Sequence, residues 1–375
     1  MSAAPKELPR WAEVALVPAA SVATAFVAAG LVVLAIGENP FEALVILLRG
    51  ALGSGEGVGF TLYYATNFIF TGLAVAVAFH AGLFNIGGEG QATLGGLGAA
   101  LVALAFDSTL PAILLLPLAV IASALFGAAW ALIPAWLQAK RDSHIVITTI
   151  MFNFLAATLL VYLLVGPLKP VGSMAPDTRG FAASAALPTM QGLLGLFGLS
   201  IPASPLNISF LLSLVAAAFV WLLIWRSRLG YEIRAFGFNP EATAYAGISA
   251  TKITIVTLLI SGALAGLMAS NEILGAQHRL SLGFVSGYGF VGIAVALMGR
   301  SHPVGVVLAS ILFGVLYQGG AELAFEKPAI TRDMIVVIQG LVILFAGALE
   351  RQFHAPLTAI FGRRPTRAET QAAAS

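Results

Sequence analysis

The segment His80–Gly98 places polar side chains at the start of a long apolar stretch. It has the sequence HAGLFNIGGEGQATLGGLG, in which Asn85, Glu89 and Gln91 stand among glycines. An ionisable residue inside a membrane span costs about 2.5–3.5 kcal/mol to insert, which makes it a functional hypothesis. The glycines allow a broken helix whose backbone groups line a pathway or bind a solute. The alternative for Glu89 is a cap on the helix that begins here, and both roles can coexist.

Side-chain amides recur in the other apolar stretches. An amide can hydrogen-bond a ribose hydroxyl or a base edge without placing a charge in lipid. As a set the amides suggest a pathway for a neutral polar solute, with Phe68 able to stack on a base or sugar face. The alternative is hydrogen bonding between helices, worth about 0.6 kcal/mol on average, with core packing for Phe68. The predicted pathway residues are Asn67, Phe68, Asn85, Glu89, Gln91, Asn153, Gln318 and Gln339, while Asn271 and Glu272 lie at the outer end of a span.

The sequence lacks the residues for several kinds of chemistry. It has no cysteine, which removes disulfides, thiolate metal sites and a cysteine nucleophile. No group of His, Asp or Glu has metal-ligand spacing. A P-loop needs Gly-Lys-Ser/Thr, and no lysine follows a glycine, so the chain cannot bind ATP in that way. We therefore expect no catalytic residue, no metal and no cofactor in this chain.

The composition requires membrane-spanning elements to position these residues. Of 375 residues, 59% are hydrophobic and 10% are charged, whereas a soluble domain has about 25% charged residues. This excludes an ordinary soluble enzyme, a disordered protein and a nucleic-acid-binding domain, and it predicts contact with membrane lipid. The apolar runs are continuous rather than alternating, which predicts helices and not a barrel.

We expect an all-α, polytopic membrane protein in which residues 1–375 form a single transmembrane domain. Lys6 and Arg10 precede an apolar run as in a signal sequence, but the run Val14–Ile36 is too long for one and predicts a retained span. The shorter stretch 41–52 predicts an interfacial or re-entrant helix. About ten spans are predicted, over residues 14–36, 62–79, 83–105, 110–137, 145–166, 206–225, 253–274, 284–299, 304–322 and 333–350.

The basic residues predict the orientation of these spans. With the N-terminus inside, 13 of the 19 basic residues lie in inner segments and 6 in outer segments, as the positive-inside rule favours. Both termini are then cytoplasmic, loop 166–205 is outside and loop 226–252 is inside. In the inner loop, Asn239 as N-cap and Pro240 in the first turn predict a short helix over 240–246, with Glu241 at its positive end.

Two sets of features suggest an inverted repeat of spans two to five and seven to ten. The fourth span contains Phe126-Gly127 and the ninth contains Phe313-Gly314, and an Arg-Asp pair follows each. Glycine-rich stretches open the third and eighth spans. The paired features fall on opposite membrane faces, as inverted repeats around a central pathway require. The alternative is that glycine-rich packing helices look alike by chance.

Four segments together resemble a known family. The sequence is similar to permease subunits of ABC importers for nucleosides and simple sugars, in the broad group that includes branched-chain amino acid permeases. The pattern from Asn85 to Gln91 differs from those of ribose-type and branched-chain amino acid permeases, which favours a nucleoside, with a simple sugar as the alternative. The matching segments, in order, are FNIGGEGQ (84–91), HIVITTIMFNFLA (144–156), LGYEIRAFGFNPEATAYAGI (229–248) and GFVGIAVALMGRSHPVG (289–305).

The resemblance implies a type II-like ABC importer permease of the inner membrane that works by alternating access. It implies separate ATPase subunits that use ATP and Mg, a second permease subunit, identical or related, and an extracytoplasmic solute-binding protein. Nucleic acid is not an expected partner. The loop 226–252 resembles the coupling loop of such permeases, which implies ATPase contacts at Glu232, Arg234, Asn239, Pro240 and Glu241.

The alternative from another class is a stand-alone secondary transporter driven by an ion gradient. It would need an acidic or histidine relay in the middle of the membrane. Only Glu89 and Glu272 lie near predicted spans, and both stand close to span ends.

Overall fold

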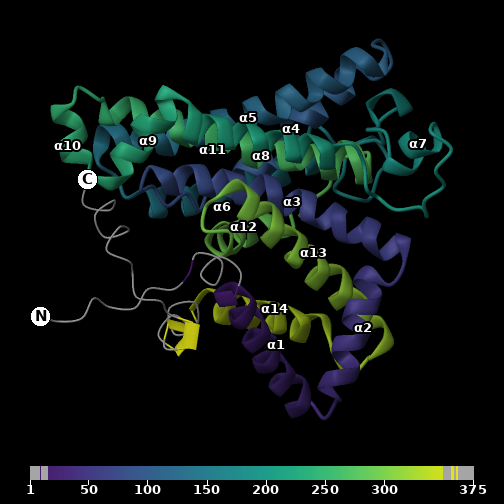
Figure 1. Cartoon of the computed structure of the whole chain (residues 1–375). Coiled ribbons are helices and arrows are strands. Elements are labelled where there is room, and N and C mark those ends of the chain that lie inside the picture. The colour runs from purple at the N-terminus through teal and green to yellow at the C-terminus, as the bar shows by residue number, and fades with distance from the viewer. Residues whose placement is uncertain (1–8, 10–15, 349–355, 359, 362–375) are drawn as a thin grey trace, which may run out of the picture. The chain divides into compact units, whose positions relative to one another are not determined.

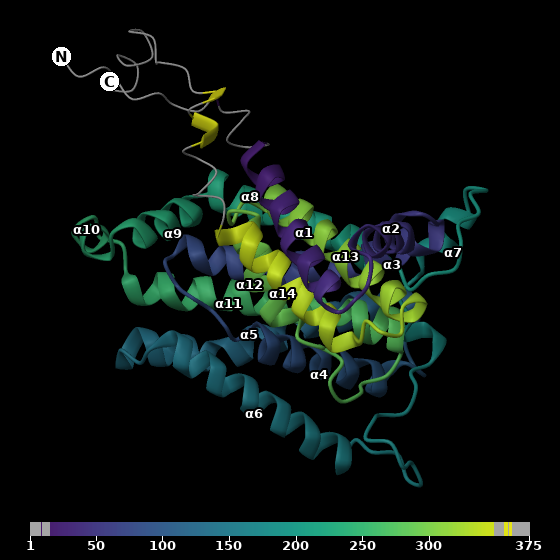
Figure 2. The same cartoon turned by 90° about the horizontal axis from the view of Figure 1, so that it is seen from below.

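The described part of the chain is helical, with isolated β-bridges in place of strands. The computed structural model describes residues 9, 16–348, 356–358 and 360–361 (Figures 1 and 2). The predictions that rest on Lys6, Arg10, residues 349–350, Arg351, Arg363, Arg364 and Arg367 lie outside these residues. The helices are α1 (Val17–Ala35), α2 (Pro40–Leu52), α3 (Gly55–His80), α4 (Gly88–Phe106), α5 (Ala112–Arg141), α6 (Ile145–Val165), η2 (Ala183–Ala185), α7 (Met190–Gly195), α8 (Ser209–Arg226), α9 (Arg228–Phe238), α10 (Pro240–Tyr245), α11 (Ala250–Ala269), the π-helical η3 (Ser270–Gln277), α12 (Tyr288–Met298), α13 (Pro303–Glu326) and α14 (Arg332–Ala348).

Each predicted span coincides with a helix, but not every helix has the length of a span. In the described part, seven helices are long and apolar enough to cross a membrane, or eight if the bent pair formed by α1 and α2 is one span. The helix α12 has only 11 residues and α14 has 17. Within the described residues, length and composition therefore support fewer than the ten predicted spans.

Local capping explains where several helices begin. The hydroxyl of Ser54 accepts a hydrogen bond from the Gly57 N–H at 2.9 Å, so α3 starts seven residues before the predicted span. The predicted cap of α10 is confirmed, because Asn239 Oδ1 accepts from the Ala242 N–H at 3.0 Å. The left-handed Gly247, with φ of 76°, follows the end of this helix.

The chain divides into two compact units, each described here by itself. In the unit Arg49–Gly319, α11 packs closely against α3, α4 and α5 (Figure 2). The closest approach is at Gly127 of α5, where an added Cβ would collide with the backbone of Gly262 and Gly266 in α11. Ser123 bridges the same two helices by donating to the Gly266 carbonyl. Small residues allow this approach, as in other membrane helix pairs.

The glycine contacts follow the predicted repeat. Spans four and nine correspond to α5 and α13, and spans two and seven correspond to α3 and α11. Gly127 of α5 packs on the backbone of α11, and Gly314 of α13 packs on the backbone of α3 at Thr61. Equivalent glycines thus meet equivalent helices, which is the arrangement that an inverted repeat predicts.

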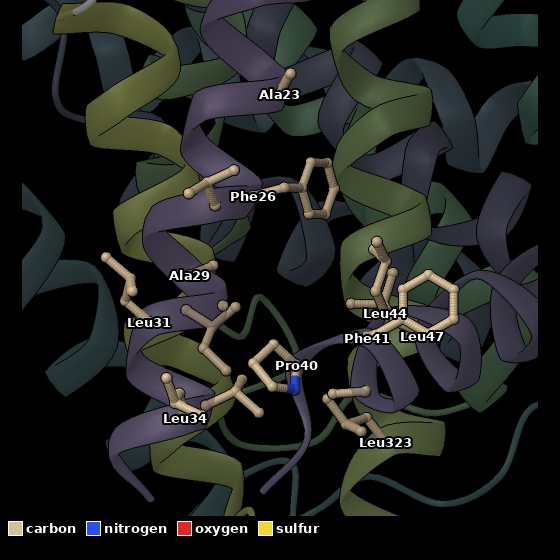
Figure 3. Close-up of a pocket in the computed structure, with 15 residues that line it drawn as sticks. Ala23, Phe26, Ala29, Leu31, Leu34, Pro40, Phe41, Leu44, Leu47 and Leu323 are labelled. Atoms are coloured by element: carbon tan, nitrogen blue, oxygen red, sulfur yellow. The ribbon is translucent and has the colours of Figure 1, made fainter.

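The other unit contains residues up to Leu48 and from Gly320 onwards. Here α1 packs against α14, and α1 and α2 are bent by 118° about the residues that join them. The bend opens a groove of about 570 Å³ lined entirely by apolar residues, among them Phe26, Leu31 and Phe41 (Figure 3). Because this groove offers no polar side chain, it suits hydrocarbon and not a neutral polar solute.

The α5–α11 contact gives the first prediction. Gly127→Val should lower the free energy of unfolding by about 1–3 kcal/mol, because the added side chain overpacks a backbone contact. Thermal unfolding of the detergent-purified protein measures the effect. Gly195→Val is the control, since nothing lies within 4 Å of a Cβ added there. Equal melting temperatures for the two variants would contradict the proposed stabilising role of the α5–α11 contact.

Candidate functional site

Three buried amides hold the chain break between α3 and α4. Asn85 Nδ2 donates to Gln91 Oε1 at 3.0 Å and to Ser261 Oγ at 2.8 Å, and Asn85 Oδ1 accepts from the Gly87 N–H at 2.9 Å. Asn153 of α6 accepts from the Gly90 N–H at 2.9 Å and donates to the Ile86 carbonyl at 3.0 Å. The structure thus brings Asn85, Gln91 and Asn153 to one place, where they satisfy freed backbone groups.

Glu89 caps a different helix from the one predicted. Its two carboxylate oxygens accept from the N–H groups of Gly287 at 2.8 Å and Gly289 at 2.9 Å, at the start of α12. The reading of Glu89 as a cap on its own helix is therefore wrong, because the carboxylate reaches across to the positive end of another helix dipole. Gly289 lies directly against Glu89, so no side chain fits between the two helix starts.

A second polar cluster surrounds the buried carboxylate of Glu272. Asn67 Nδ2 donates to Glu272 Oε1 at 2.7 Å, and Gln277 Nε2 donates to Oε2 at 3.2 Å. Asn271 Nδ2 donates to Asn67 Oδ1 at 2.8 Å, and Tyr63 also hydrogen-bonds the carboxylate. The cluster joins α3 to η3. We refer to Tyr63, Asn67, Asn271, Glu272 and Gln277 as the Glu272 cluster.

Aromatic rings adjoin the Glu272 cluster. The fully buried Phe68 contacts Tyr288 at a centroid distance of 5.5 Å, Phe313 at 5.8 Å and Tyr317 at 4.9 Å. Tyr317 also lies 5.8 Å from Tyr64, and these two rings are only partly buried. The rings come from α3, α12 and α13, so three elements distant in sequence meet beside one polar cluster.

The remaining predicted pathway residues lie in different units. Gln318 is buried on α13 next to Tyr317, within the unit Arg49–Gly319. Gln339 is buried on α14 in the other unit, where its amide lies close to Gly320. Among the described residues, no group of three or more His, Asp or Glu side chains could hold a metal ion.

Comparison with known proteins identifies the family of the chain. Residues 57–347 match the family model described as the permease component of branched-chain amino acid transport systems. The chain belongs to this permease family. It is an integral membrane protein and the permease of an ABC transporter, not its ATPase.

Three similar proteins cover nearly the whole chain. The glucose ABC transporter permease TsgB13 of Haloferax volcanii is 38% identical over 88% of this chain and 86% of its own. The guanosine ABC transporter permease NupP of Bacillus subtilis is 36% identical over 89% and 93%. The nucleoside ABC transporter permease NupB of Lactococcus lactis is 34% identical over 88% and 90%. No solved structure matches the chain significantly.

Loop 226–252, which we predict to be cytoplasmic, forms two helices, of which the sequence predicted only α10. Ser227 caps α9 by accepting from the Gly230 N–H at 3.0 Å, and Arg228 pairs with Glu232 at 3.0 Å along its surface. Ile233 and Phe236 of this helix are buried. The serine cap and this apolar spacing were the signals for α9. The α9–α10 segment and α7 lie at opposite ends of the bundle (Figure 1).

The end of α9 rests on the end of α3. An added Cβ at Gly237 would collide with the His80 carbonyl, the last residue of α3. A ring nitrogen of His80 lies 3.1 Å from the Ser301 carbonyl, in the turn between α12 and α13. Trp225 packs against both His80 and His302, at centroid distances of 5.1 and 5.0 Å. One contact cluster therefore joins the inner helices to α3 and to the α12–α13 turn.

The outer loop of the permease lies over η3 and the residues that follow it. The backbone N–H groups of Thr178, Phe181 and Leu187 donate to the carbonyls of Leu280, His278 and Leu274, respectively, at 2.8–3.0 Å. The predicted loop 166–205 is therefore attached by regular backbone hydrogen bonds to the segment that carries Glu272.

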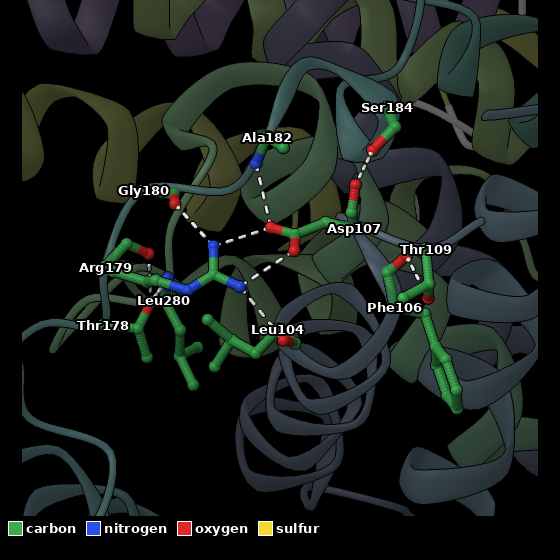
Figure 4. A network of polar contacts seen from close by, with 10 residues as sticks. All are labelled: Leu104, Phe106, Asp107, Thr109, Thr178, Arg179, Gly180, Ala182, Ser184 and Leu280. Atoms are coloured by element: carbon green, nitrogen blue, oxygen red, sulfur yellow. Dashed lines mark hydrogen bonds and ion pairs between the residues drawn. The ribbon is translucent and has the colours of Figure 1, made fainter. Parts of the chain in front are cut away.

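A bidentate ion pair attaches the same loop to α4 (Figure 4). Arg179 donates to both carboxylate oxygens of Asp107, at 2.7 and 2.8 Å, and the Ala182 N–H donates to Asp107 as well. Hydrogen bonding from Arg179 holds the pKa of the Asp107 carboxyl below its ordinary value, despite the desolvation that opposes this shift. We call this pair the outer strap.

Sequence reasoning missed the outer strap and the cluster around Glu272. Their partners are 72 residues apart in the first case and 205 in the second. The only available signal was a lone charged residue beside an apolar run, at Asp107 and at Glu272.

The outer strap gives a prediction that depends on pH. Asp107→Asn should free loop 166–205 and raise the rate of tryptic cleavage at Arg179. The substitution should lower the free energy of unfolding by only about 1 kcal/mol, because Arg179 is 48% exposed and water screens the ion pair. Since the folded pKa is lowered, the strap is complete above the ordinary carboxyl pKa and weakens as pH falls towards the lowered one.

Limited proteolysis of the purified permease, with melting temperature against pH, measures both effects. Asp142→Asn is the matched control, because Asp142 lies at the other end of α5 in a left-handed conformation that asparagine tolerates. Identical cleavage rates for wild type and Asp107→Asn would refute the strap.

Proposed function

We propose that this permease forms the translocation pathway of an ABC importer for a nucleoside. The observation that carries the proposal is the polar cluster around Glu272, with aromatic rings beside it and no cation paired to it among the described residues. Such a site suits a neutral solute with hydroxyl groups and a flat ring. Two of the three similar permeases are named for guanosine and for nucleosides.

A simple sugar is the second candidate substrate. The similarity to a permease named for glucose, 38% identical to this chain, favours it directly. A sugar presents hydroxyl groups to the same amides and its apolar face to the same rings. The two candidates differ in the base, which only a nucleoside has.

The proposed pathway residues divide into two roles. Asn67 and Phe68 contact the Glu272 cluster and its rings, so they are proposed to meet the solute, with Gln318 and Gln339 as further amides of the pathway. Asn85, Glu89, Gln91 and Asn153 are proposed to act from the break between α3 and α4. Their hydrogen bonds hold the starts of α4 and α12, and so set the width of the pathway.

The proposed partners follow from the family. Two ATPase subunits, which use ATP and Mg, drive the import; a second permease subunit completes the pathway; and an extracytoplasmic binding protein delivers the solute. The complex lies in the inner membrane with both permease termini in the cytoplasm. The outer loop, at the end of the bundle away from α9 and α10, is the proposed contact for the binding protein.

The α9–α10 segment is the proposed ATPase contact. Phe238 and Tyr245 are 90% and 95% exposed there, next to the exposed Glu241 and the cap formed by Asn239 and Pro240. Exposed aromatic side chains bind by filling pockets of a partner, as hot-spot residues do. Glu232 and Arg234 lie on α9, which transmits the ATPase movement to α3 through Gly237 and His80.

ATP dependence tests the proposed function. Adenosine uptake into proteoliposomes that contain the permease, its ATPase and its binding protein should require ATP and magnesium. Omission of the ATPase should reduce uptake to the rate of empty vesicles, because this chain has no P-loop. Uptake by the permease alone, driven by a proton gradient, would instead support a secondary transporter.

The α9–α10 segment gives a separate prediction. Phe238→Ser and Glu241→Arg should each weaken co-purification of the ATPase by about tenfold or more, while membrane insertion stays normal. Phe197→Ser is the matched control, because Phe197 is 82% exposed in the outer loop. Co-purification unchanged from wild type in the first two variants would exclude this segment as the ATPase contact.

A further inference from the structure

Glu272 is a buried carboxylate in an unusual stretch of backbone. It lies in η3, a π-helical segment that continues α11, and only 4% of the residue is exposed. π-helical turns are frequent at functional sites because they cost stability and redirect side chains. A carboxylate inside a membrane protein is also costly and is by default a functional hypothesis.

The hydrogen bonds of Glu272 leave it able to accept another. A carboxylate has about four acceptor positions. Asn67, Gln277 and Tyr63 occupy three of them. No Lys, Arg or His of the described residues forms an ion pair with Glu272. An incoming hydroxyl group can therefore add a further hydrogen bond to Glu272.

The partly buried rings of Tyr64 and Tyr317 are connected to this carboxylate through Asn67 and Phe68 of α3. Tyr317 contacts Phe68 at 4.9 Å and Tyr64 at 5.8 Å, and Phe68 follows Asn67 on α3. A flat heterocycle can stack on such rings at the cost of little conformational freedom. The hydroxyl acceptor and the ring faces are thus joined through two consecutive residues of α3, Asn67 and Phe68.

The cluster lies beneath the outer loop. Gln277 links Glu272 to Ser281, whose hydroxyl donates to Gln277 Oε1, and both residues are partly exposed. The backbone of the outer loop bonds to Leu274, His278 and Leu280 along this same segment. A solute released at the outer face therefore meets this polar chain before the apolar interior.

We infer that the Glu272 cluster is the nucleoside-recognition site of the permease. Glu272 accepts hydrogen bonds from the ribose hydroxyls, and the rings of Tyr64 and Tyr317 contact the base. A nucleotide is excluded, because the Glu272 cluster contains no cation that could neutralise its phosphate. The inference rests on the proposed function and adds to it the residues that select the substrate.

The test pairs a change in the protein with a change in the solute. Glu272→Gln retains the shape but replaces one acceptor oxygen with a donor. Equilibrium binding of radiolabelled adenosine and 2′,3′-dideoxyadenosine is measured on the purified permease–ATPase complex without binding protein. The variant should bind adenosine about tenfold or more weakly, because hydrogen bonds to charged groups are strong. It should bind the dideoxynucleoside within about twofold of wild type.

Equal weakening for both solutes would mean a packing role for Glu272 and would overturn the inference, as would no weakening. Binding of glucose in place of adenosine by wild type would also overturn it. Glu56→Gln is the control, since Glu56 is an exposed carboxylate at the start of α3.

A second pair of variants covers the case in which Glu272→Gln fails to assemble. Tyr317→Leu should lose binding of both nucleosides, while Tyr317→Phe keeps it, because the ring face and not the hydroxyl is used. Wild-type binding by Tyr317→Leu would refute the site. Uptake assays separate this inference from the proposed function: ATP-driven adenosine uptake that persists in Glu272→Gln rejects only the inference, and ATP-independent uptake by wild type rejects the function.

Discussion

Every backbone group freed by a broken helix in a membrane must find a partner within the protein. This constraint explains why several buried polar residues of the permease lie where they do. Between α3 and α4 the freed groups bond to Asn85 and Asn153, and at the start of α12 they bond to Glu89. Asn153 and Glu89 reach segments far from their own in sequence, and Asn85 also reaches Ser261 of α11, so these side chains also bind the helices together.

The same constraint separates two kinds of buried polar residue. Glu89 and Asn153 bond to backbone N–H and carbonyl groups, which gives them a positioning role. Glu272 is bonded instead to side chains, Asn67, Gln277 and Tyr63, and these can rearrange without breaking a helix. Side-chain partners are what a site needs if a solute is to replace or join them, because backbone partners leave no freedom to exchange.

The sequence predicted the positions of the membrane helices and the α10 cap, because both depend on local pattern. It marked Gly127 and Gly314 as paired features of a repeat, but it did not predict the backbone contacts that they make. It did not predict that Glu89 would cap α12 or that Asn67 would meet Glu272. These contacts join residues about 200 positions apart, and nothing local specifies them. The helix α9 was missed for a different reason, since two glycines in its 11 residues lower its helix propensity and its tertiary contacts override that.

A single rigid element connects the two ends of the proposed mechanism. The helix α3 runs unbroken from Gly55 to His80 and carries Asn67 about 20 Å from its inner end, at 1.5 Å per residue. At that end Gly237 of α9 packs directly on the His80 carbonyl, so α9 has no room to move without displacing α3. His80 also bonds to Ser301 in the turn that ends α12, and α12 begins beside Glu89 and Tyr288. A displacement of α9 is therefore delivered to α3, which carries Phe68, and to α12, whose Tyr288 contacts Phe68, because tightly packed contacts shift together instead of deforming.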